Sequence, residues 1–303
     1  MVISNSIFNF HTFPSQTWTE QTLLILKQYF HLVDHQNIKD YFYEEKVLKN
    51  ACHITIDDGD LSVLNNLFPV IVKHQIPISI FVSPKITVNQ TNFWFQEVNE
   101  LNPRIFFDFV SNKLSLNSNF ENKSQLLSII KSLEVKNILD LIHQFKYENN
   151  IPDIGRKNLN VEELRELNKS KLIHIGAHTN NHPILNNESS ETAEKEIKNS
   201  IEELSDLLNT RIDSFAYPNG IPNLDFSARE IEILKKSGIK TAFSTQQKRF
   251  SKRDNPLAIP RYSISKGGKL TVSAKIILGK HWENIRKLKK RKNEIYFRNL
   301  NNF

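Results

Sequence analysis

The stretch His53-Ile54-Thr55-Ile56-Asp57-Asp58-Gly59 runs from a short β-forming segment directly into two adjacent carboxylates and a glycine. The apolar and β-branched residues predict a buried strand, and Gly59 permits the sharp exit that a loop at its end needs. Because neighbouring side chains on an extended chain point in opposite directions, Asp57 and Asp58 can serve different partners, one binding a cation and the other staying free as a base. The alternative is an N-cap followed by an ordinary Asp-Gly turn.

Two more predicted strands end in reactive side chains. The run 172–176 leads to a loop with two histidines, and the run 214–217 leads to a Pro-Asn-Gly turn. The remaining pattern predicts strands and helices in alternation: strands at 76–82, 241–244 and 257–264, and helices at 19–33, 61–74, 126–145, 161–168, 189–208 and 226–237. Such alternation favours an α/β fold with a mainly parallel sheet, open or closed into a barrel. Reactive groups gather at the carboxyl ends of the strands in these folds, so we expect the three loops at one end of the sheet.

His178 and His182 are four residues apart, a spacing that can present two imidazoles to one metal ion. Pro183 follows at once and the glutamate of the zinc-protease motif His-Glu-x-x-His is absent, so we expect a loop or a single turn rather than a long helix. With one carboxylate, the pair suits zinc, cobalt, iron or nickel and leaves positions for water and substrate. The alternative is a pair of histidines on a polar face. His174, which alternates within the preceding strand, is interpreted as structural.

Two weaker candidates follow. Asn219, in the turn after Tyr217, could direct a backbone N–H toward a developing oxyanion, although the same residues are ordinary turn chemistry. Arg261 could pair with a carboxylate through its fork of donors, or form only a surface salt bridge. The sequence contains no G-x-G-x-x-G or G-x-x-x-x-G-K-[ST] phosphate loop, no G-x-S-x-G elbow and no nucleophilic cysteine motif. These absences exclude nucleotide-driven and acyl-enzyme mechanisms.

The 303-residue chain has 40 Lys and Arg against 33 Asp and Glu, with 39% hydrophobic and 24% charged residues, as is usual for globular proteins. No run of about 18 apolar residues occurs, so no membrane-spanning helix is expected. Cys52 is the only cysteine, which excludes a disulfide framework or a multi-cysteine zinc site within the chain. The N-terminus lacks the features of a secretory signal, and we therefore expect a cytoplasmic protein.

Most of the net positive charge lies in residues 280–303, where eight basic residues face only Glu283 and Glu294. The rest of the chain is close to neutral, so no nucleic-acid partner is expected. Because aromatic and aliphatic residues interleave these charges, the basic tail could lie on an anionic membrane surface and place the protein peripherally at the inner membrane face. The alternative, which we favour, is a solvated terminal helix with a few residues docked on the body. Nothing in the sequence indicates the oligomeric state.

Taken in order, these motifs resemble those of the polysaccharide deacetylases, carbohydrate esterase family 4. Residues 53–59 resemble the family's Thr-Phe-Asp-Asp-Gly motif, and residues 175–183 resemble its His-[Ser/Thr]-x-x-His metal motif. Residues 215–220 resemble its Phe-Ala-Tyr-Pro-x-Gly motif, and residues 259–261 resemble its late Pro-Arg step. The resemblance runs over about residues 11–261, and the ordered set of motifs makes it specific.

The resemblance implies a distorted (β/α)7-type barrel and a divalent metal, most readily zinc, with cobalt, nickel or iron as other choices. The implied metal ligands are Asp58, His178 and His182. Asp57 would be the general base, the backbone N–H of Asn219 would help to stabilise the oxyanion, and Arg261 would hold Asp57 ionised and oriented. This division of roles agrees with metal chemistry, since a bound cation lowers the pKa of water from about 15.7 toward 7.

The resemblance also implies the domain organisation and the substrate. Residues 1–279 would form the catalytic domain, with a helical insertion at about 90–160, and residues 280–303 would form a basic C-terminal tail. The predicted protein is a polysaccharide deacetylase-like hydrolase that cleaves an amide bond. It would remove an acetyl group from an N-acetylated amino sugar in a polysaccharide, an oligosaccharide or a lipid-linked glycan.

Three departures from the family pattern keep alternatives open. Ile56 replaces the usual aromatic residue, and the third-motif arginine is absent before Tyr217, which leaves its task to Arg261. The final Leu-x-His motif, whose histidine protonates the leaving amine, has no clear match, and His281 is only a weak candidate for that role. One alternative is a catalytically silent carbohydrate-binding protein on the same fold, which the missing general acid supports. The other is a deformylase of a lipid-linked sugar, which the absent signal and the basic tail support.

Overall fold

The computed structural model describes residues 4–264, 273, 294–295 and 298. Its centre is a sheet with the strand order β7-β6-β5-β4-β3-β1-β8, in which β2 pairs with β3 and each of these pairs is parallel. The strands are short and mostly buried: β1 (Ser6–Phe10), β2 (His31–Leu32), β3 (Ala51–Ile56), β4 (Ile78–Val82), β5 (Ile173–Ala177), β6 (Ser214–Ala216), β7 (Thr241–Phe243) and β8 (Tyr262–Ser263).

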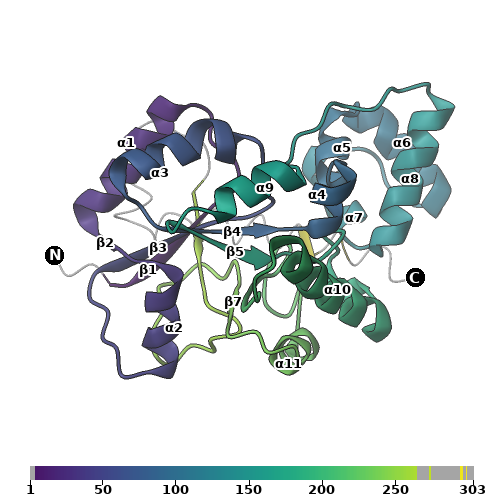
Figure 1. Cartoon of the computed structure of the whole chain (residues 1–303). Coiled ribbons are helices and arrows are strands. Elements are labelled where there is room, and N and C mark those ends of the chain that lie inside the picture. The colour runs from purple at the N-terminus through teal and green to yellow at the C-terminus, as the bar shows by residue number, and fades with distance from the viewer. Residues whose placement is uncertain (1–3, 265–272, 274–293, 296–297, 299–303) are drawn as a thin grey trace.

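The late extended segment brings the two edges of the sheet together. Ile259 forms a parallel bridge with Phe243 of β7, and β8 pairs with β1 at Phe8 and Asn9. One short segment, residues 259–263, therefore contacts both β7 and β1. The sheet curls into a half-barrel with helices around it (Figure 1).

The helices cover the sheet on both sides and extend beyond it on the right of Figure 1. In chain order they are α1 (Gln16–Tyr29), α2 (His35–Tyr43), η1 (Val63–Leu67), α3 (Phe68–His74), α4 (Pro84–Asn89), α5 (Trp94–Glu100), α6 (Pro103–Leu114), α7 (Lys123–Ile130), α8 (Val135–Glu148), α9 (Val161–Asn168), η2 (Leu185–Asn187), α10 (Ser190–Leu208) and α11 (Ala228–Lys236). Side-chain caps start several of them; Ser189, for example, accepts from the N–H of Thr192 at the start of α10.

Helices α5 to α8 form a group beside the barrel with a hydrophobic core of their own, which includes Phe106, Phe107 and Ile129. The single helix predicted at 126–145 is wrong, because α7 and α8 are separate helices. The chain turns between them where the Ser132 hydroxyl donates to the carbonyl oxygen of Ile129, at 2.6 Å. The carboxylate of Glu188 then accepts from the first N–H of α8, that of Val135, at 2.7 Å. Local capping thus ends a run whose apolar spacing alone looks continuous.

Strand β1 was not predicted from the sequence. Its residues Ser-Ile-Phe-Asn-Phe are all buried, and two of them, Ser6 and Asn9, are polar and interrupt the apolar pattern that signals a strand. The strand pairs along its whole length with β3, residue Phe10 lying opposite Ile56. It is therefore placed beside the predicted site.

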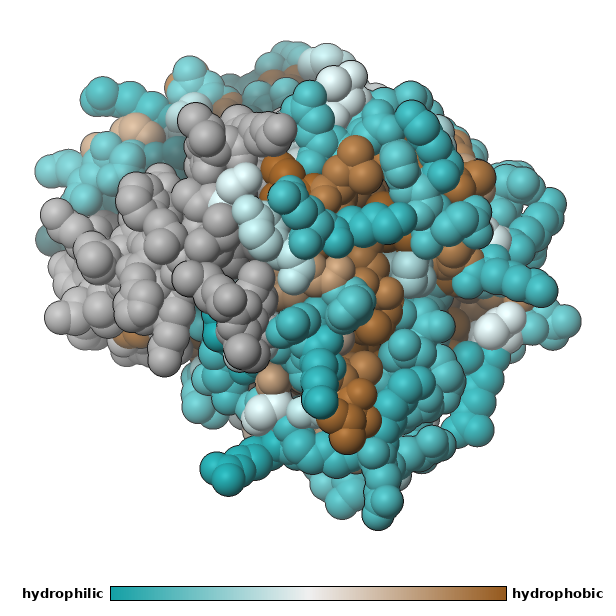
Figure 2. Space-filling view, turned by 90° about the vertical axis from the view of Figure 1, so that its left-hand side faces the viewer, coloured by the Kyte–Doolittle hydropathy of each residue, from teal (hydrophilic) through white to brown (hydrophobic). Residues whose placement is uncertain are grey.

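Figure 2 faces the left-hand side of Figure 1, where β1 begins, and shows a largely hydrophilic surface crossed by a narrow band of apolar residues. Within the described residues, none of the helices combines the length and the apolar character that crossing a bilayer would require. Of the basic tail, Arg298 lies against the body, donating to the buried carboxylate of Asp225 at 2.7 Å. His281 lies outside the described residues.

Candidate active site

The two adjacent aspartates are both buried and follow β3 directly. The chain leaves the strand in a left-handed conformation, with φ of 73° at Asp58 and 69° at Gly59. A side chain at position 59 would bring its Cβ within 2.9 Å of Val82, so both the backbone and the packing require glycine there. The two carboxylates point in different directions, as expected. The cause is the left-handed turn at Asp58, and not the alternation of side chains along an extended strand.

Asp57 is held by three side-chain donors. Arg261 donates from Nη1 to Oδ1 and from Nη2 to Oδ2, both at 2.8 Å, and Asn9 of β1 donates to Oδ2 at 2.9 Å. Burial alone would raise the pKa of Asp57, but the charge and hydrogen bonds of Arg261, together with the nearby His178, outweigh it and hold that pKa below its ordinary value. The carboxylate is therefore ionised and fixed in direction. Asn9 was not predicted, because it lies on the strand that the sequence pattern did not reveal.

Arg261 is fully buried, although the sequence left a surface salt bridge open for it. Besides Asp57, its guanidinium donates to the Thr55 hydroxyl and the Ser244 carbonyl oxygen, each at 3.1 Å. It also lies over the neighbouring rings of Phe81 and Phe243, 5.9 and 5.7 Å from their centroids. A buried arginine with this many partners is oriented before any ligand arrives.

Asp58 and the two histidines form what we call the carboxyl-end cluster: Asp58, His178 and His182. Asp58 Oδ1 lies 3.5 Å from His178 Nε2 and 3.6 Å from His182 Nε2. All three side chains are buried, and Asp58 Oδ1 has no hydrogen-bond partner in the described part of the chain. A carboxylate oxygen left unpaired among two imidazole nitrogens fits a bound divalent cation, which would satisfy it.

Each histidine of this cluster offers its Nε2 to the shared point. His178 donates from Nδ1 to the carbonyl oxygen of Ala216 at 2.7 Å, which leaves Nε2 as the free nitrogen. Burial would lower the pKa of His178, but the neighbouring carboxylates of Asp58 and Asp57 together raise it above the ordinary value. Burial dominates at His182 and lowers its pKa to about 3, so that this ring is neutral near pH 7. A neutral imidazole is the form that binds a metal ion.

The histidine loop is an irregular turn, as predicted, and α10 holds it in place. Glu196 of α10 accepts from the backbone N–H groups of Asn180 and Asn181 at 3.0 and 2.9 Å. Trp94 of α5 donates to the carbonyl oxygen of His182 at 2.9 Å, and so links the helical insertion to the site. The only sequence signal for Glu196 was its position within a strongly predicted helix, which gives no indication of a tertiary partner.

Asn219 lies in the turn that follows β6 and has a left-handed φ of 55°. The turn is anchored on both sides: the Thr245 hydroxyl donates to the carbonyl oxygen of Asn219 at 2.6 Å, and the buried Tyr217 hydroxyl donates to Leu257 at 2.7 Å. Since β6 pairs with β5, this turn lies next to the loop that carries His178. The structure thus gathers the three predicted loops at the carboxyl end of the sheet.

The family model described as polysaccharide deacetylase matches residues 44–242. The chain belongs to the polysaccharide deacetylase family. Both the resemblance drawn from the motifs and the expected class, a polysaccharide deacetylase-like hydrolase, are confirmed at the level of this family.

Two relatives carry the name poly-beta-1,6-N-acetyl-D-glucosamine N-deacetylase. The protein of Staphylococcus epidermidis is 25% identical over 225 residues, which cover 74% of this chain and 58% of that relative. The protein of Staphylococcus aureus is 24% identical over 254 residues, which cover 83% of this chain and 67% of that relative. This chain therefore spans little more than half the length of the first relative.

Solved structures match the fold over most of its length. IcaB from Ammonifex degensii aligns with a TM-score of 0.59 and 18% identity, covering 90% of this chain and 97% of its own. The Streptococcus pyogenes deacetylase PplD, solved in complex with acetate, aligns with a TM-score of 0.56 and 15% identity over 87% and 93% of the two chains. These likenesses confirm the predicted distorted (β/α) barrel.

Proposed function

We propose that this protein is a metal-dependent N-deacetylase that hydrolyses the acetamide groups of an N-acetylglucosamine polymer. The observation that carries the proposal is the convergence of Asp58, His178 and His182 beside an ionised carboxylate, that of Asp57. The names of the two staphylococcal relatives support an acetylated glucosamine polymer as the substrate class.

The carboxyl-end cluster would hold the cation, with zinc the first choice for two nitrogens and one oxygen. When bound, such an ion polarises an acetyl carbonyl and makes a nearby water more acidic. The chain's own residues set the direction of the chemistry. The hydrogen bond to Ala216 fixes the ring of His178, and the bond from Trp94 holds the backbone that carries His182.

Asp57 is proposed as the base that takes the proton from the attacking water. Both of its oxygens accept hydrogen bonds from Arg261, which keeps the carboxylate charged in a buried setting. The Asn219 turn would supply a backbone N–H to the developing oxyanion. His281, the weak sequence candidate for protonating the leaving amine, lies outside the described residues.

The two alternatives considered from the sequence gain no support from the comparisons. Neither relative is named as a deformylase, and the carboxylate and both histidines of the cluster are present together with Asp57 and Arg261. A silent binding protein has no need of a base held ionised inside the fold. The cytoplasmic location and the membrane contact of the basic tail remain predictions.

The test is release of acetate from N-acetylglucosamine oligomers joined by β-1,6 links, with β-1,4-linked oligomers as the comparison substrate. Protein stripped with a chelator should lose turnover and regain it with zinc or cobalt. Asp57→Asn should lower turnover by roughly 10²- to 10⁴-fold without lowering the bound metal, since it removes the base and spares the ligands.

The matched control is Asp140→Asn, the same change at an exposed position of α8. It should leave turnover as in the unchanged protein. Chelator-resistant turnover, or an Asp57→Asn variant as active as Asp140→Asn, would contradict the proposal. Turnover of the β-1,4-linked oligomers alone would correct the linkage and leave the chemistry standing.

A further inference from the structure

A second group of two histidines and one aspartate lies at the other end of the strands. We call it the amino-end cluster: His35, His174 and Asp213. His35 begins α2, His174 is the second residue of β5, and Asp213 directly precedes β6. One nitrogen or oxygen of each lies within 4.8 Å of the others. His174 precedes His178 by four residues on β5, so about 13 Å of strand separates the two clusters.

The spacing of the amino-end cluster is close to that of the carboxyl-end cluster. Asp213 Oδ1 lies 3.6 Å from His174 Nε2 and 4.0 Å from His35 Nδ1. Tetrahedral zinc with bonds of about 2.0–2.1 Å separates its ligand atoms by roughly 3.3 Å. To share one ion, these two pairs of atoms would therefore have to close by about 0.3 and 0.7 Å.

Hydrogen bonds decide which nitrogen of each ring is available to an ion. His35 Nε2 lies 2.7 Å from the Thr241 hydroxyl, a contact that fixes the ring and leaves Nδ1 directed at Asp213. The rings of His35 and His174 are stacked, with centroids 3.6 Å apart and planes within 11° of parallel, so one ring must turn for both nitrogens to point at one ion. His174 Nε2 shares a hydrogen bond with the Ser214 hydroxyl at 2.7 Å, and that hydroxyl can rotate to release the nitrogen.

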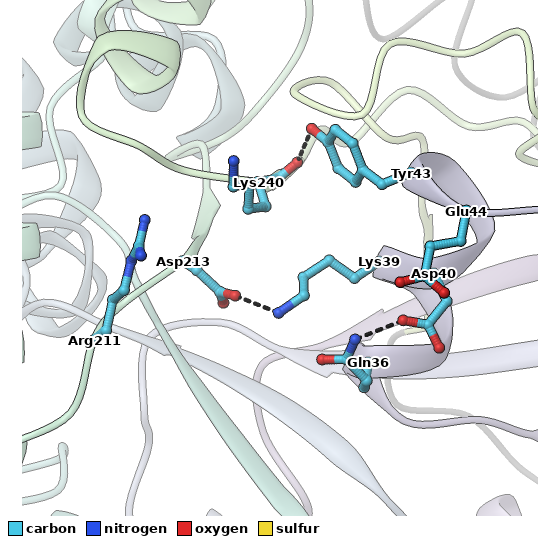
Figure 3. A pocket seen from close by; sticks show the side chains of 8 residues that line it. All are labelled: Gln36, Lys39, Asp40, Tyr43, Glu44, Arg211, Asp213 and Lys240. Atoms are coloured by element: carbon cyan, nitrogen blue, oxygen red, sulfur yellow. Dashed lines mark hydrogen bonds and ion pairs between the residues drawn. The ribbon is translucent and has the colours of Figure 1, made fainter.

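Asp213 supplies the observation that points to a cation. Its Oδ2 accepts from Lys39 Nζ at 2.7 Å, but its Oδ1 is buried and has no hydrogen-bond partner among the described residues. Leaving a carboxylate oxygen without a partner is costly, so such an atom indicates a missing ligand. Figure 3 shows Asp213 and Lys39 facing each other across this end of the fold.

An ion can reach this cluster from solvent. His174 and Asp213 remain 27% and 16% exposed, and both line a cavity of about 340 Å³ together with His35. Although Lys39 and Arg211 also line this cavity, Lys39 is already paired with Asp213. The described residues that line the cavity therefore provide ligands and an entry path, together with three positive side chains that oppose a cation, those of Lys39, Lys171 and Arg211, and a further carboxylate, that of Asp34, that favours one.

We propose that His35, His174 and Asp213 form a second binding site for a zinc-like divalent cation. The donor set of two imidazoles and one carboxylate is the one that zinc, cobalt and nickel prefer. The bound ion would join α2 to β5 and β6 at the amino end of the sheet. It would stabilise the fold and take no part in deacetylation, since the proposed base Asp57 and the Asn219 turn lie at the opposite end of the sheet.

The full chain is stripped with a chelator and equilibrated with zinc. The experiment then counts the zinc ions bound per chain and measures the affinity of the protein for zinc by titration. The unchanged protein should take up two equivalents. A His178→Gln/His182→Gln variant, which retains only the amino-end cluster, should still bind one equivalent and should gain thermal stability when zinc is added. Adding Asp213→Asn to that variant should weaken the remaining site by about 100-fold.

Two further variants keep the test decisive. His35→Gln removes a different ligand in case Asp213→Asn disturbs folding, and Asp140→Asn in the same background is the matched control that should leave zinc binding unchanged. The proposal is overturned if the His178→Gln/His182→Gln variant binds no zinc. It is also overturned if the His178→Gln/His182→Gln background binds zinc equally well with Asp213 and with Asn at that position.

Discussion

The carboxyl-end and amino-end clusters have the same three donors, two imidazoles and one carboxylate, yet their surroundings differ. In the carboxyl-end cluster all three side chains are buried, and a second carboxylate, that of Asp57, lies next along the chain, paired with Arg261. In the amino-end cluster, two of the three side chains are partly exposed, and Lys39 occupies one oxygen of Asp213. A similar donor set is thus placed in two very different electrostatic environments.

This difference shows that the donors alone do not decide what a site does. Hydrolysis needs a base that is charged, buried and directed at the reacting water, and only the carboxyl-end cluster has one beside it in the described residues. The lysine beside the amino-end cluster offers charge of the opposite sign, which reduces affinity for a cation. The same chemistry of ligands therefore supports catalysis at one end and, in our proposal, stabilisation at the other.

The largest effect is expected from Arg261→Met, which removes the charge that makes the carboxyl-end cluster different. Asp57 would be left buried and uncompensated, so the free energy of unfolding should fall by roughly 3–5 kcal/mol, and acetate release should be lost. Urea denaturation and the acetate assay measure the two effects. Arg261→Met combined with Asp57→Asn should recover most of the stability and none of the activity. An Arg261→Met variant as stable as the unchanged protein would show that the ion pair does not hold the base.

A smaller effect is expected when the pH is lowered, through His53, a fully buried residue of β3. It donates from Nδ1 to the Val33 carbonyl oxygen and accepts from Ser79, both at 2.8 Å. Burial lowers the pKa of His53 to about 4, whereas in the unfolded chain it is about 6.5. Between these values only the unfolded state binds the proton, so the stability is fully present above pH 6.5 and falls toward pH 4 by up to about 1.4 kcal/mol per pH unit.

The measurement is the free energy of unfolding in urea at several pH values between 7 and 4. His53→Gln cannot take up the proton, and its pH slope should be smaller by one proton in this range. His143→Gln, at an exposed position of α8, serves as the control and should keep the slope of the unchanged protein. Equal slopes for His53→Gln and His143→Gln would exclude His53 as the titrating group.

The smallest effect is expected from Lys39→Met, which makes the amino-end cluster more like its counterpart. Because the ion pair with Asp213 is partly exposed, the free energy of unfolding should change by less than about 1 kcal/mol. Removal of the positive charge should tighten zinc binding by roughly tenfold in the His178→Gln/His182→Gln background. Isothermal titration with zinc gives the affinity, and unchanged or weaker binding would show that Lys39 does not oppose a cation there.

Much of the carboxyl-end site could be predicted because its residues follow strands directly. The sequence 53–59 places both aspartates after a β-forming run, and the His178 and His182 spacing marks a pair of metal ligands in a loop. In a parallel sheet such loops meet at one edge, so their proximity follows from the order of the elements. The separate partners of Asp57 and Asp58 were also expected, although the left-handed backbone at Asp58 provides the separation.

By itself, the sequence determined the α/β class, the order of the motifs and the residue types at the carboxyl ends of the strands. Only the tertiary structure revealed Asn9 beside Asp57, Glu196 under the histidine loop, and the meeting of His35, His174 and Asp213. The physical reason is the distance along the chain. Local spacing fixes a helix, a strand or a turn. The contacts of Asn9 and Glu196 join residues between 15 and 48 positions apart, and the amino-end cluster joins three separate parts of the chain. Such contacts depend on how the sheet curls.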